Sequence, residues 1–288
     1  MASIAQVSQQ LNHFLNASSA PIVDLRQADQ FALGHISASA NFPEDTLFDR
    51  LHELPQKSQP LRLVAEPQLL SLLNEKLTSK GFLIEAKLEW SEMLASELRS
   101  RELLAFGESY CRLWEPAAII ETFVAQFAKN ASGKRALDLG CGSGRDSVYL
   151  ALNGWQVTAV DYLQAAIGNL AQLAQNHRVS VKGLQLDLEQ QNDPLGQLPG
   201  PFDLILVIRY LHRPLLTQIR DKIAEGGFIV YQTFMQGCEK FGKPKNPRFL
   251  LKPGELANVF TGFEVLVDKI EYLDDGRPTN VFIARKSK

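Results

Sequence analysis

The sequence is poor in features that would assign a function class at once. Its three cysteines, Cys111, Cys141 and Cys238, are too few and too scattered for a disulfide framework or a Cys-x-x-Cys motif. No basic and apolar leader is visible, and the central apolar run 204–208 is far too short to cross a bilayer. The formal net charge of −2 gives no general attraction to nucleic acid or anionic membranes. We therefore expect a cytoplasmic protein without a bound metal, a membrane partner or a nucleic-acid partner.

What the sequence does have is an alternation of strand and helix patterns in two stretches. Its 288 residues suit two domains better than one. A segment rich in helix formers separates the two stretches. We predict an N-terminal α/β domain over 1–95, a helical linker over 96–112 and a C-terminal domain over 113–288.

The second stretch alternates more clearly than the first. Strands are expected at 135–139, 156–160, 179–186, 202–208 and 228–234, and helices at 145–153, 163–175 and 214–225. Two further β-rich runs, 263–272 and 279–285, flank a turn with an Asp-Gly pair, which predicts an antiparallel hairpin. The pattern predicts a doubly wound parallel sheet that ends in an antiparallel edge.

The most informative stretch is 137–144, which reads Leu-Asp-Leu-Gly-Cys-Gly-Ser-Gly. An apolar strand is followed by three alternating glycines and a helix, so backbone N–H groups can closely approach a nucleotide-like ligand. A dinucleotide fingerprint would need glycine where Arg145 stands, and a phosphate-binding P-loop would need Gly-Lys-Ser/Thr. Neither motif is present. The carboxylate of Asp138 instead suits a cofactor that carries an ammonium group.

Two more acids are predicted at the carboxyl ends of the following strands, where open α/β sheets bind ligands. Asp161 can accept hydrogen bonds from both hydroxyls of a ribose. Asp187 can accept one from an exocyclic adenine amine, while Leu188 packs on the ring. An ordinary strand–helix turn with capping acids is the alternative explanation.

With these residues, the stretch from about 108 to 288 resembles the class I S-adenosylmethionine-dependent methyltransferases. The resemblance implies a Rossmann-like α/β fold with a seven-stranded sheet, parallel except for its last strand, and S-adenosylmethionine as the cofactor. It also implies that the glycine turn holds the methionine end of the cofactor, Asp161 the ribose and Asp187 the adenine. The implied cofactor-binding set is Asp138, Gly140, Cys141, Gly142, Gly144, Asp161, Tyr162, Asp187 and Leu188.

Acceptor-binding and catalytic groups are expected after the fourth strand of this domain, at 208–214. His212 could act as a general base, because histidine is the side chain whose unperturbed pKa lies closest to neutrality, although a solvated histidine at a helix start is the simpler explanation. Arg209, Tyr210 and Arg213 could hold an anionic or polar acceptor, and salt bridges to neighbouring helices explain them equally well. The Asn/Asp-Pro-Pro-aromatic signature of relatives that methylate amides and adenine is absent.

The loop expected at 238–248 is locally basic and would lie over the acceptor site as a lid, with a solvated mobile loop as the alternative. The runs 113–116 and 246–256 resemble the tellurite-resistance and thiopurine methyltransferase-like branch, whose members methylate chalcogen oxyanions and thiols. We therefore expect a small soft methyl acceptor. An RNA or protein methyltransferase is the first alternative, and a non-enzymatic cofactor-binding protein is the second.

The N-terminal stretch, to about residue 90, resembles a rhodanese-like domain. The resemblance rests on Ile22-Val23-Asp24-Leu25-Arg26 and on Gly34-His35-Ile36. It implies that Asp24, Arg26 and His35 support the fold, with an ion pair between the first two.

This module is expected to be catalytically inactive. Rhodanese chemistry needs a cysteine thiolate after the strand predicted at 61–65, where this chain reads Glu66-Pro67. The first cysteine of the chain is Cys111. A homodimer or a protein partner bound through this module stays open.

Overall fold

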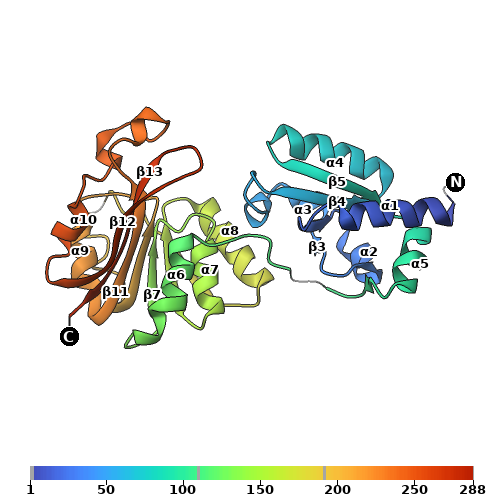
Figure 1. The fold of residues 1–288 in the computed structure, drawn as a ribbon. Coiled ribbons are helices and arrows are strands. Elements are labelled where there is room, and N and C mark those ends of the chain that lie inside the picture. Colours follow the sequence, from blue (N-terminus) through green and yellow to red (C-terminus); the bar gives the residue numbers. More distant parts are fainter. Residues whose placement is uncertain (1–2, 109–110, 191–192, 288) are drawn as a thin grey trace. The chain divides into compact units, whose positions relative to one another are not determined.

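The computed structural model describes residues 3–108, 111–190 and 193–287. The chain divides into two compact units, Met1–Glu115 and Pro116–Lys288 (Figure 1). Each unit has its own sheet and its own hydrophobic core. Within the described ranges, no helix is both long and apolar enough to cross a membrane.

The first unit contains a four-stranded parallel sheet in the order β3-β1-β4-β5. Its strands are β1 (Ile22–Asp24), β3 (Ala40–Asn41), β4 (Pro60–Ala65) and β5 (Leu83–Glu89), with β2 (His35–Ile36) and β6 (Leu104–Ala105) as a separate antiparallel pair. Its helices are α1 (Ile4–Asn16), α2 (Ala28–Leu33), α3 (Glu44–Leu47), α4 (Pro67–Ser79) and α5 (Glu92–Ser100), with a 3₁₀ turn at Leu51–Glu53.

Helices cover both faces of this sheet because the residues of β4 alternate between two clusters. Leu61 and Leu63 pack with the buried leucines of α4 on one face. Val64 packs with the apolar side chains of α1 and α5 on the other face (Figure 1). The helical linker predicted over 96–112 is therefore corrected: α5 packs on α1 and β6 pairs with β2, so both belong to the first unit.

The second unit contains a seven-stranded sheet in the order β12-β13-β11-β10-β7-β8-β9. Its strands are β7 (Arg135–Leu139), β8 (Gln156–Asp161), β9 (Val181–Gln185), β10 (Phe202–Ile208), β11 (Ile223–Phe234), β12 (Phe263–Tyr272) and β13 (Pro278–Lys286). The strands from β7 to β11 are parallel, and β13 is antiparallel to both β11 and β12. The predicted parallel sheet with an antiparallel finishing strand is thus confirmed.

Helices flank this sheet on both sides (Figure 1). They are α6 (Ala118–Gln126), α7 (Arg145–Leu152), α8 (Gln164–Asn176), α9 (Leu215–Lys222) and α10 (Glu255–Val259), with 3₁₀ turns at Ala128–Asn130, Cys238–Lys240 and Pro247–Phe249. Along β10, Leu204 and Leu206 pack towards α6, whereas Ile205 and Val207 pack towards α9 and α10. Burying each such side chain contributes about 1.5–3 kcal/mol, so this strand anchors the unit.

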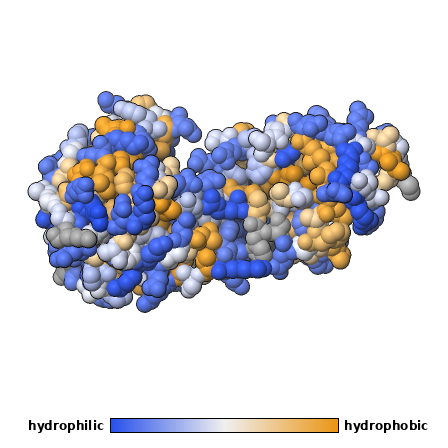
Figure 2. Space-filling view, turned by 60° about the horizontal axis from the view of Figure 1, so that its bottom comes forward, coloured by the Kyte–Doolittle hydropathy of each residue, from blue (hydrophilic) through white to orange (hydrophobic). Residues whose placement is uncertain are grey.

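The surfaces of both units combine hydrophilic and hydrophobic areas on the face drawn in Figure 2.

The order of the strands in the second sheet indicates where a ligand can bind to the second unit. The chain order reverses between β7 and β10, which lie side by side. In open α/β sheets, ligands bind outside the carboxyl ends of the strands at such a switch point.

Candidate functional site

The glycine turn between β7 and α7 depends on the absence of side chains. Gly140, Gly142 and Gly144 have φ angles of 75°, 53° and 82°, which a residue with a Cβ rarely adopts. A Cβ on Gly144 would lie 2.1 Å from Cδ1 of the buried Leu170. A Cβ on Gly140 would lie 3.3 Å from the Tyr210 ring atom Cγ. The turn therefore packs against α8 on one side and against the end of β10 on the other.

The carboxylate of Asp161 fixes this turn from the neighbouring strand. Its Oδ2 atom accepts a hydrogen bond of 2.9 Å from the Gly142 backbone N–H, and its Oδ1 atom accepts one of 3.0 Å from Leu163. Asp161 is largely buried at the end of β8 but still lines a cavity. Because a carboxylate can accept about four hydrogen bonds, capacity is left for a ligand.

Asp138 lies behind the turn, fully buried at the end of β7. The Ser147 hydroxyl donates a hydrogen bond of 2.5 Å to its Oδ2 atom. Burial, reinforced by the negative charges of Asp146 and Asp161, raises the pKa of Asp138 to about 8, against the lowering effect of the Ser147 hydrogen bond. This carboxyl group is therefore largely protonated at neutral pH.

A cavity of about 520 Å³ opens at the carboxyl ends of β7, β8, β9 and β10. Its lining includes Gly140, Asp161, Tyr162, Asp187, Leu188, Glu189, Arg209 and Tyr210. Of the predicted residues, Cys141, Gly142 and Gly144 belong to the turn and Asp138 to the end of β7, and none of these four lines this cavity. The volume lies in the range of about 300–1,000 Å³ that is typical of small-molecule sites.

Two consecutive residues after β10 line this cavity, and among the described residues their side chains have no hydrogen-bond or ion-pair partner. Arg209 has a φ of 56°, which is an uncommon backbone conformation. Its backbone N–H donates a hydrogen bond of 2.7 Å to the Gln232 carbonyl, which holds this conformation. Its guanidinium makes no ion pair or hydrogen bond within the part of the chain that the structure describes. The Tyr210 hydroxyl is buried and has no hydrogen-bond partner there either. Burial and the nearby charges of Glu189 and Asp187 raise the pKa of this hydroxyl.

His212 lines neither this cavity nor the adjoining one described below. Its Nδ1 atom lies 3.7 Å from Oε2 of Glu189, whose same oxygen accepts a hydrogen bond of 2.8 Å from Arg248. Sequence reasoning missed Glu189, which lines the cavity two residues after Asp187. The only signal in the sequence was the position of Glu189 shortly after β9, which ends at Gln185.

The next arginine has a structural role in holding the basic loop. The Arg213 guanidinium is paired with Glu255, with Nε–Oε1 at 2.6 Å. It also donates to the backbone carbonyls of Arg248 and Leu250, both at 2.8 Å. These bonds tie the loop after β11 to the start of α9.

A second cavity, of about 650 Å³, lies under this loop. It shares Glu189, Arg209 and Tyr210 with the first cavity. Its other lining residues are Leu211, Thr233, Phe234, Lys243, Pro244, Lys245, Asn246 and Phe249. The two cavities therefore meet at the end of β10.

The structure has a further hollow, distant from the carboxyl ends of the strands. A hollow of about 1060 Å³ lies beside Gly200 and Ile223, at the amino ends of β10 and β11, away from the glycine turn. Among the described residues, no group of three or more His, Cys, Asp and Glu side chains could hold a metal ion.

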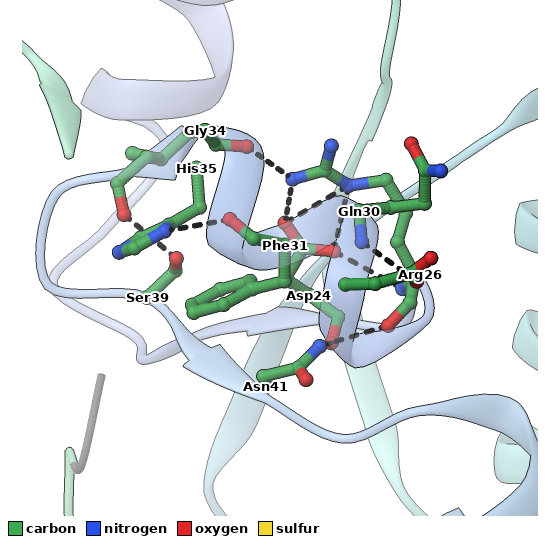
Figure 3. Close-up of polar contacts among 10 residues, drawn as sticks. Asp24, Arg26, Gln30, Phe31, Gly34, His35, Ser39 and Asn41 are labelled. Atoms are coloured by element: carbon green, nitrogen blue, oxygen red, sulfur yellow. Dashed lines mark hydrogen bonds and ion pairs between the residues drawn. The ribbon is translucent and has the colours of Figure 1, made fainter. Parts of the chain in front are cut away.

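In the first unit, the residues singled out from the sequence all have partners within the unit (Figure 3). Asp24 and Arg26 form a buried ion pair of 2.7 Å, which confirms the predicted pairing. Arg26 also donates to the Gly34 carbonyl at 2.8 Å and lies 3.5 Å from the ring centroid of Trp90. His35 stacks on Phe31, and its Nδ1 atom lies 3.0 Å from the Phe31 carbonyl oxygen.

The comparisons with known proteins bear mainly on the second unit. Residues 110–275 match the family model described as tellurite resistance protein TehB. A probable S-adenosyl-L-methionine-dependent methyltransferase TehB of Haemophilus influenzae is 35% identical over 105 residues, which cover 35% of each chain. The crystal structure of TehB from Haemophilus influenzae has a TM-score of 0.48 at 22% identity, covering 58% of this chain and 62% of that one.

One relative matches both units. An uncharacterized protein of Schizosaccharomyces pombe is 25% identical over 315 residues, which cover 92% of this chain and 93% of that protein. The two units therefore occur together in that protein as well.

Proposed function

Because this chain belongs to the TehB family and is an S-adenosylmethionine-dependent methyltransferase, we propose that it transfers the methyl group to a soft nucleophile, a thiol or a chalcogen oxyanion. The observation that carries the proposal is the pair of cavities that meet at Glu189, Arg209 and Tyr210. One cavity adjoins the glycine turn and the strand-end acids, and the other adjoins a basic loop. A donor and an acceptor held there would meet at the end of β10.

The residues of the first cavity fit the cofactor. Asp161 keeps free hydrogen-bonding capacity for ribose hydroxyls, and Asp187 and Leu188 line the same cavity, which supports their proposed contacts with the adenine. Asp138 would face the cofactor's ammonium group from behind the turn, which favours loss of the carboxyl proton. The bound cofactor supplies an electrophilic methyl group on a positively charged sulfur. The chain's part is to orient the two reactants, which can supply much of the rate enhancement.

On the acceptor side, unpaired positive charges favour an anion. Arg209, Lys243 and Lys245 line the second cavity, and their side chains have no polar partner within the described ranges. Tyr210, with its unpartnered hydroxyl, stands between the two cavities. His212 lies outside both cavities, and this position does not support its suggested role as a general base. A nucleophile that is already ionised, such as a thiolate, needs no base.

For the first unit, we propose a rhodanese-like module without sulfurtransferase activity that serves a homodimer or a protein partner. Its support is the parallel sheet, the buried Asp24–Arg26 pair and the direct passage from Ala65 into α4 at Pro67. No cysteine precedes Cys111 in the sequence, so the segment between β4 and α4 carries no thiolate on which a rhodanese persulfide could form.

The experiment that tests the proposed reaction is transfer of a labelled methyl group from S-adenosylmethionine to a panel of acceptors. The panel holds 2-mercaptoethanol, selenite, tellurite and bulk RNA. We expect turnover of at least one small acceptor, with a raised KM in Arg209→Gln and no change in Lys240→Gln, whose side chain lies outside both cavities. Methylation of RNA alone would refute the proposal.

A further inference from the structure

The outer edge of β12 is a long strand edge without a partner. β12 ends the strand order of the seven-stranded sheet, and within the described ranges no strand pairs with its outer side. It has ten residues, whereas β9 at the opposite edge has five. The edge of a sheet presents unpaired N–H and C=O groups, which another chain can pair with.

The second half of β12 is the part that is regular enough for such pairing. The register with β13 shifts between Val265 and Val267, and a bulge of this kind interrupts a ladder. At the other end, the strand stops at Tyr272, where the hairpin turn begins. The regular stretch of edge available to a partner therefore lies within 267–272.

Alternate residues of this stretch direct their backbone groups away from β13. Hydrogen-bonded and non-bonded pairs alternate along an antiparallel ladder. The Leu273 N–H donates to the Arg277 carbonyl, so the next pair, Tyr272 with Pro278, is a non-bonded pair. The Pro278 carbonyl agrees with this, because it accepts a hydrogen bond from Met235, just beyond β11. The same alternation directs outward the N–H and C=O groups of Asp268, Ile270 and Tyr272.

The side chains of this stretch fall into two sets, one on each face of the sheet. Ile270 and Tyr272 share one face with Asp268, and they are 50% and 69% exposed. Lys269 and Glu271 lie on the other face, where they form an ion pair of 2.7 Å. Their side chains are also largely exposed. The edge therefore offers apolar surface on one face and both signs of charge on the other.

Charge complementarity identifies a second copy of this chain as the partner. When two identical strands pair antiparallel about a two-fold axis, one residue opposes itself and its neighbours oppose each other. With Ile270 on the axis, Lys269 of each copy faces Glu271 of the other, which is a favourable cross-strand pair. An axis at Asp268, Lys269 or Glu271 would place like charges directly opposite each other.

We propose that two copies of this chain pair antiparallel through β12, with Ile270 on the two-fold axis. The outward backbone groups then bond between the copies, and the two Ile270 side chains contact each other. Tyr272 of each copy lies opposite Asp268 of the other, whose carboxylate can accept a hydrogen bond from the Tyr272 hydroxyl. This surface belongs to the second unit and is separate from the partner surface proposed for the first.

Sedimentation equilibrium of the full chain tests the pairing. Because the paired stretch is short, we expect the 32.1 kDa chain to dimerise with a dissociation constant of about 10 μM. Ile270→Asp puts two carboxylates on the axis and is expected to weaken dimerisation about 100-fold. Val265→Asp is the matched control, because Val265 is 46% exposed on the same strand but lies beyond the bulge. That change is expected to leave the dissociation constant unaltered.

An exchange of charges tests the register. Lys269→Glu alone sets carboxylates opposite each other in both copies, and we expect dimerisation to weaken about tenfold. Adding Glu271→Lys restores opposite charges across the axis, and the double variant is expected to recover most of the wild-type affinity. Binding of S-adenosylmethionine by each variant checks that the second unit is folded.

Cross-linking tests the position of the axis without relying on affinity. In a Cys111→Ser background, which removes the exposed native thiol, Ile270→Cys brings two thiols together. Paired residues of this kind have Cα atoms about 5.5 Å apart, a distance that a disulfide can span. Mild oxidation should link the Ile270→Cys chains into dimers and should not link Val265→Cys chains.

The contrary outcomes are distinct from one another. A chain that stays monomeric up to about 100 μM and gives no Ile270→Cys cross-link would overturn the proposal. A dimer that Ile270→Asp leaves intact would place the contact on another surface. A double charge variant that stays as weak as Lys269→Glu would refute the register with Ile270 on the axis.

Discussion

The two units place charged residues at the strand ends of parallel sheets, but they use these residues differently. In the first unit, Asp24 and Arg26 are buried and bonded to each other, and Arg26 also binds a backbone carbonyl. In the second unit, Asp161 and Arg209 line a cavity with hydrogen-bonding capacity left over. The difference teaches that charge at a strand end marks a ligand site only where the fold leaves it incompletely partnered.

The largest expected effect is in the first unit, where the charged residues are bonded to each other. Asp24→Ala leaves the Arg26 guanidinium buried without its carboxylate, which we expect to cost about 3–5 kcal/mol. Amide hydrogen exchange in β1 and β4 would report the loss within the first unit. The control is Asp24→Ala combined with Arg26→Leu, which removes both charges and should recover much of the stability. A small effect of Asp24→Ala alone would mean that the ion pair does not stabilise the first unit.

The next effect concerns the glycine turn that distinguishes the second unit. Gly144→Ala must place a methyl group against the buried Leu170 at a φ of 82°, and we expect a loss of roughly 2–4 kcal/mol in urea unfolding. Gly168→Ala is the matched control, since it lies in α8 with no atom within 4 Å of the added Cβ. That change should stabilise the helix by about 0.5–1 kcal/mol. Equal effects of the two changes would contradict the proposed packing of the turn.

A pH-dependent effect follows from Asp138, whose pKa is about 8 in the folded chain against an ordinary value of 3.8. The folded state therefore holds a proton that the unfolded chain has released, and the stability that this proton provides is lost as pH rises towards 8. The variant Asp138→Asn has no such proton to lose. Its stability relative to wild type should rise between pH 4 and 8, by at most about 1.4 kcal/mol per pH unit. Urea unfolding of both proteins at pH 5, 7 and 9 checks this, and a constant difference would disprove the raised pKa.

The smallest effect is expected for the exposed ion pair between Arg248 and Glu189. Its side chains are 59% and 34% exposed, in contrast to the buried pair of the first unit. Arg248→Ala should change the free energy of unfolding by less than about 1 kcal/mol. A loss as large as that of Asp24→Ala would remove the contrast between the two pairs.

Much of the second unit could be predicted from sequence because its strands are short apolar runs between clear turns. The predicted strands at 135–139 and 202–208 coincide with β7 and β10. The predicted helix 214–225 ends at Lys222, because residues from Ile223 onwards pair with β10 as the start of β11. Helical periodicity carries no information about such a pairing.

What could not be predicted depends on contacts between distant residues. Glu189 accepts a hydrogen bond from Arg248, which lies 59 positions away in the chain. The helix α5 has an amphipathic pattern, but nothing in that pattern identifies α1 as its partner. For the same reason, the sequence placed Asp138 in the site without showing that it lies behind the turn. The roles of the nine cofactor residues and of His212, Arg209 and Tyr210 stay predictions.

The central claim is that cofactor binding depends on the strand-end acids of the second unit and not on those of the first. The measurement that tests it most directly is calorimetric titration of wild type, Asp161→Ala and Asp24→Ala with S-adenosylmethionine. We predict one equivalent bound by wild type and by folded Asp24→Ala with similar affinity, and binding weakened about 100-fold in Asp161→Ala, about 2.7 kcal/mol. Undiminished binding by Asp161→Ala would contradict the account.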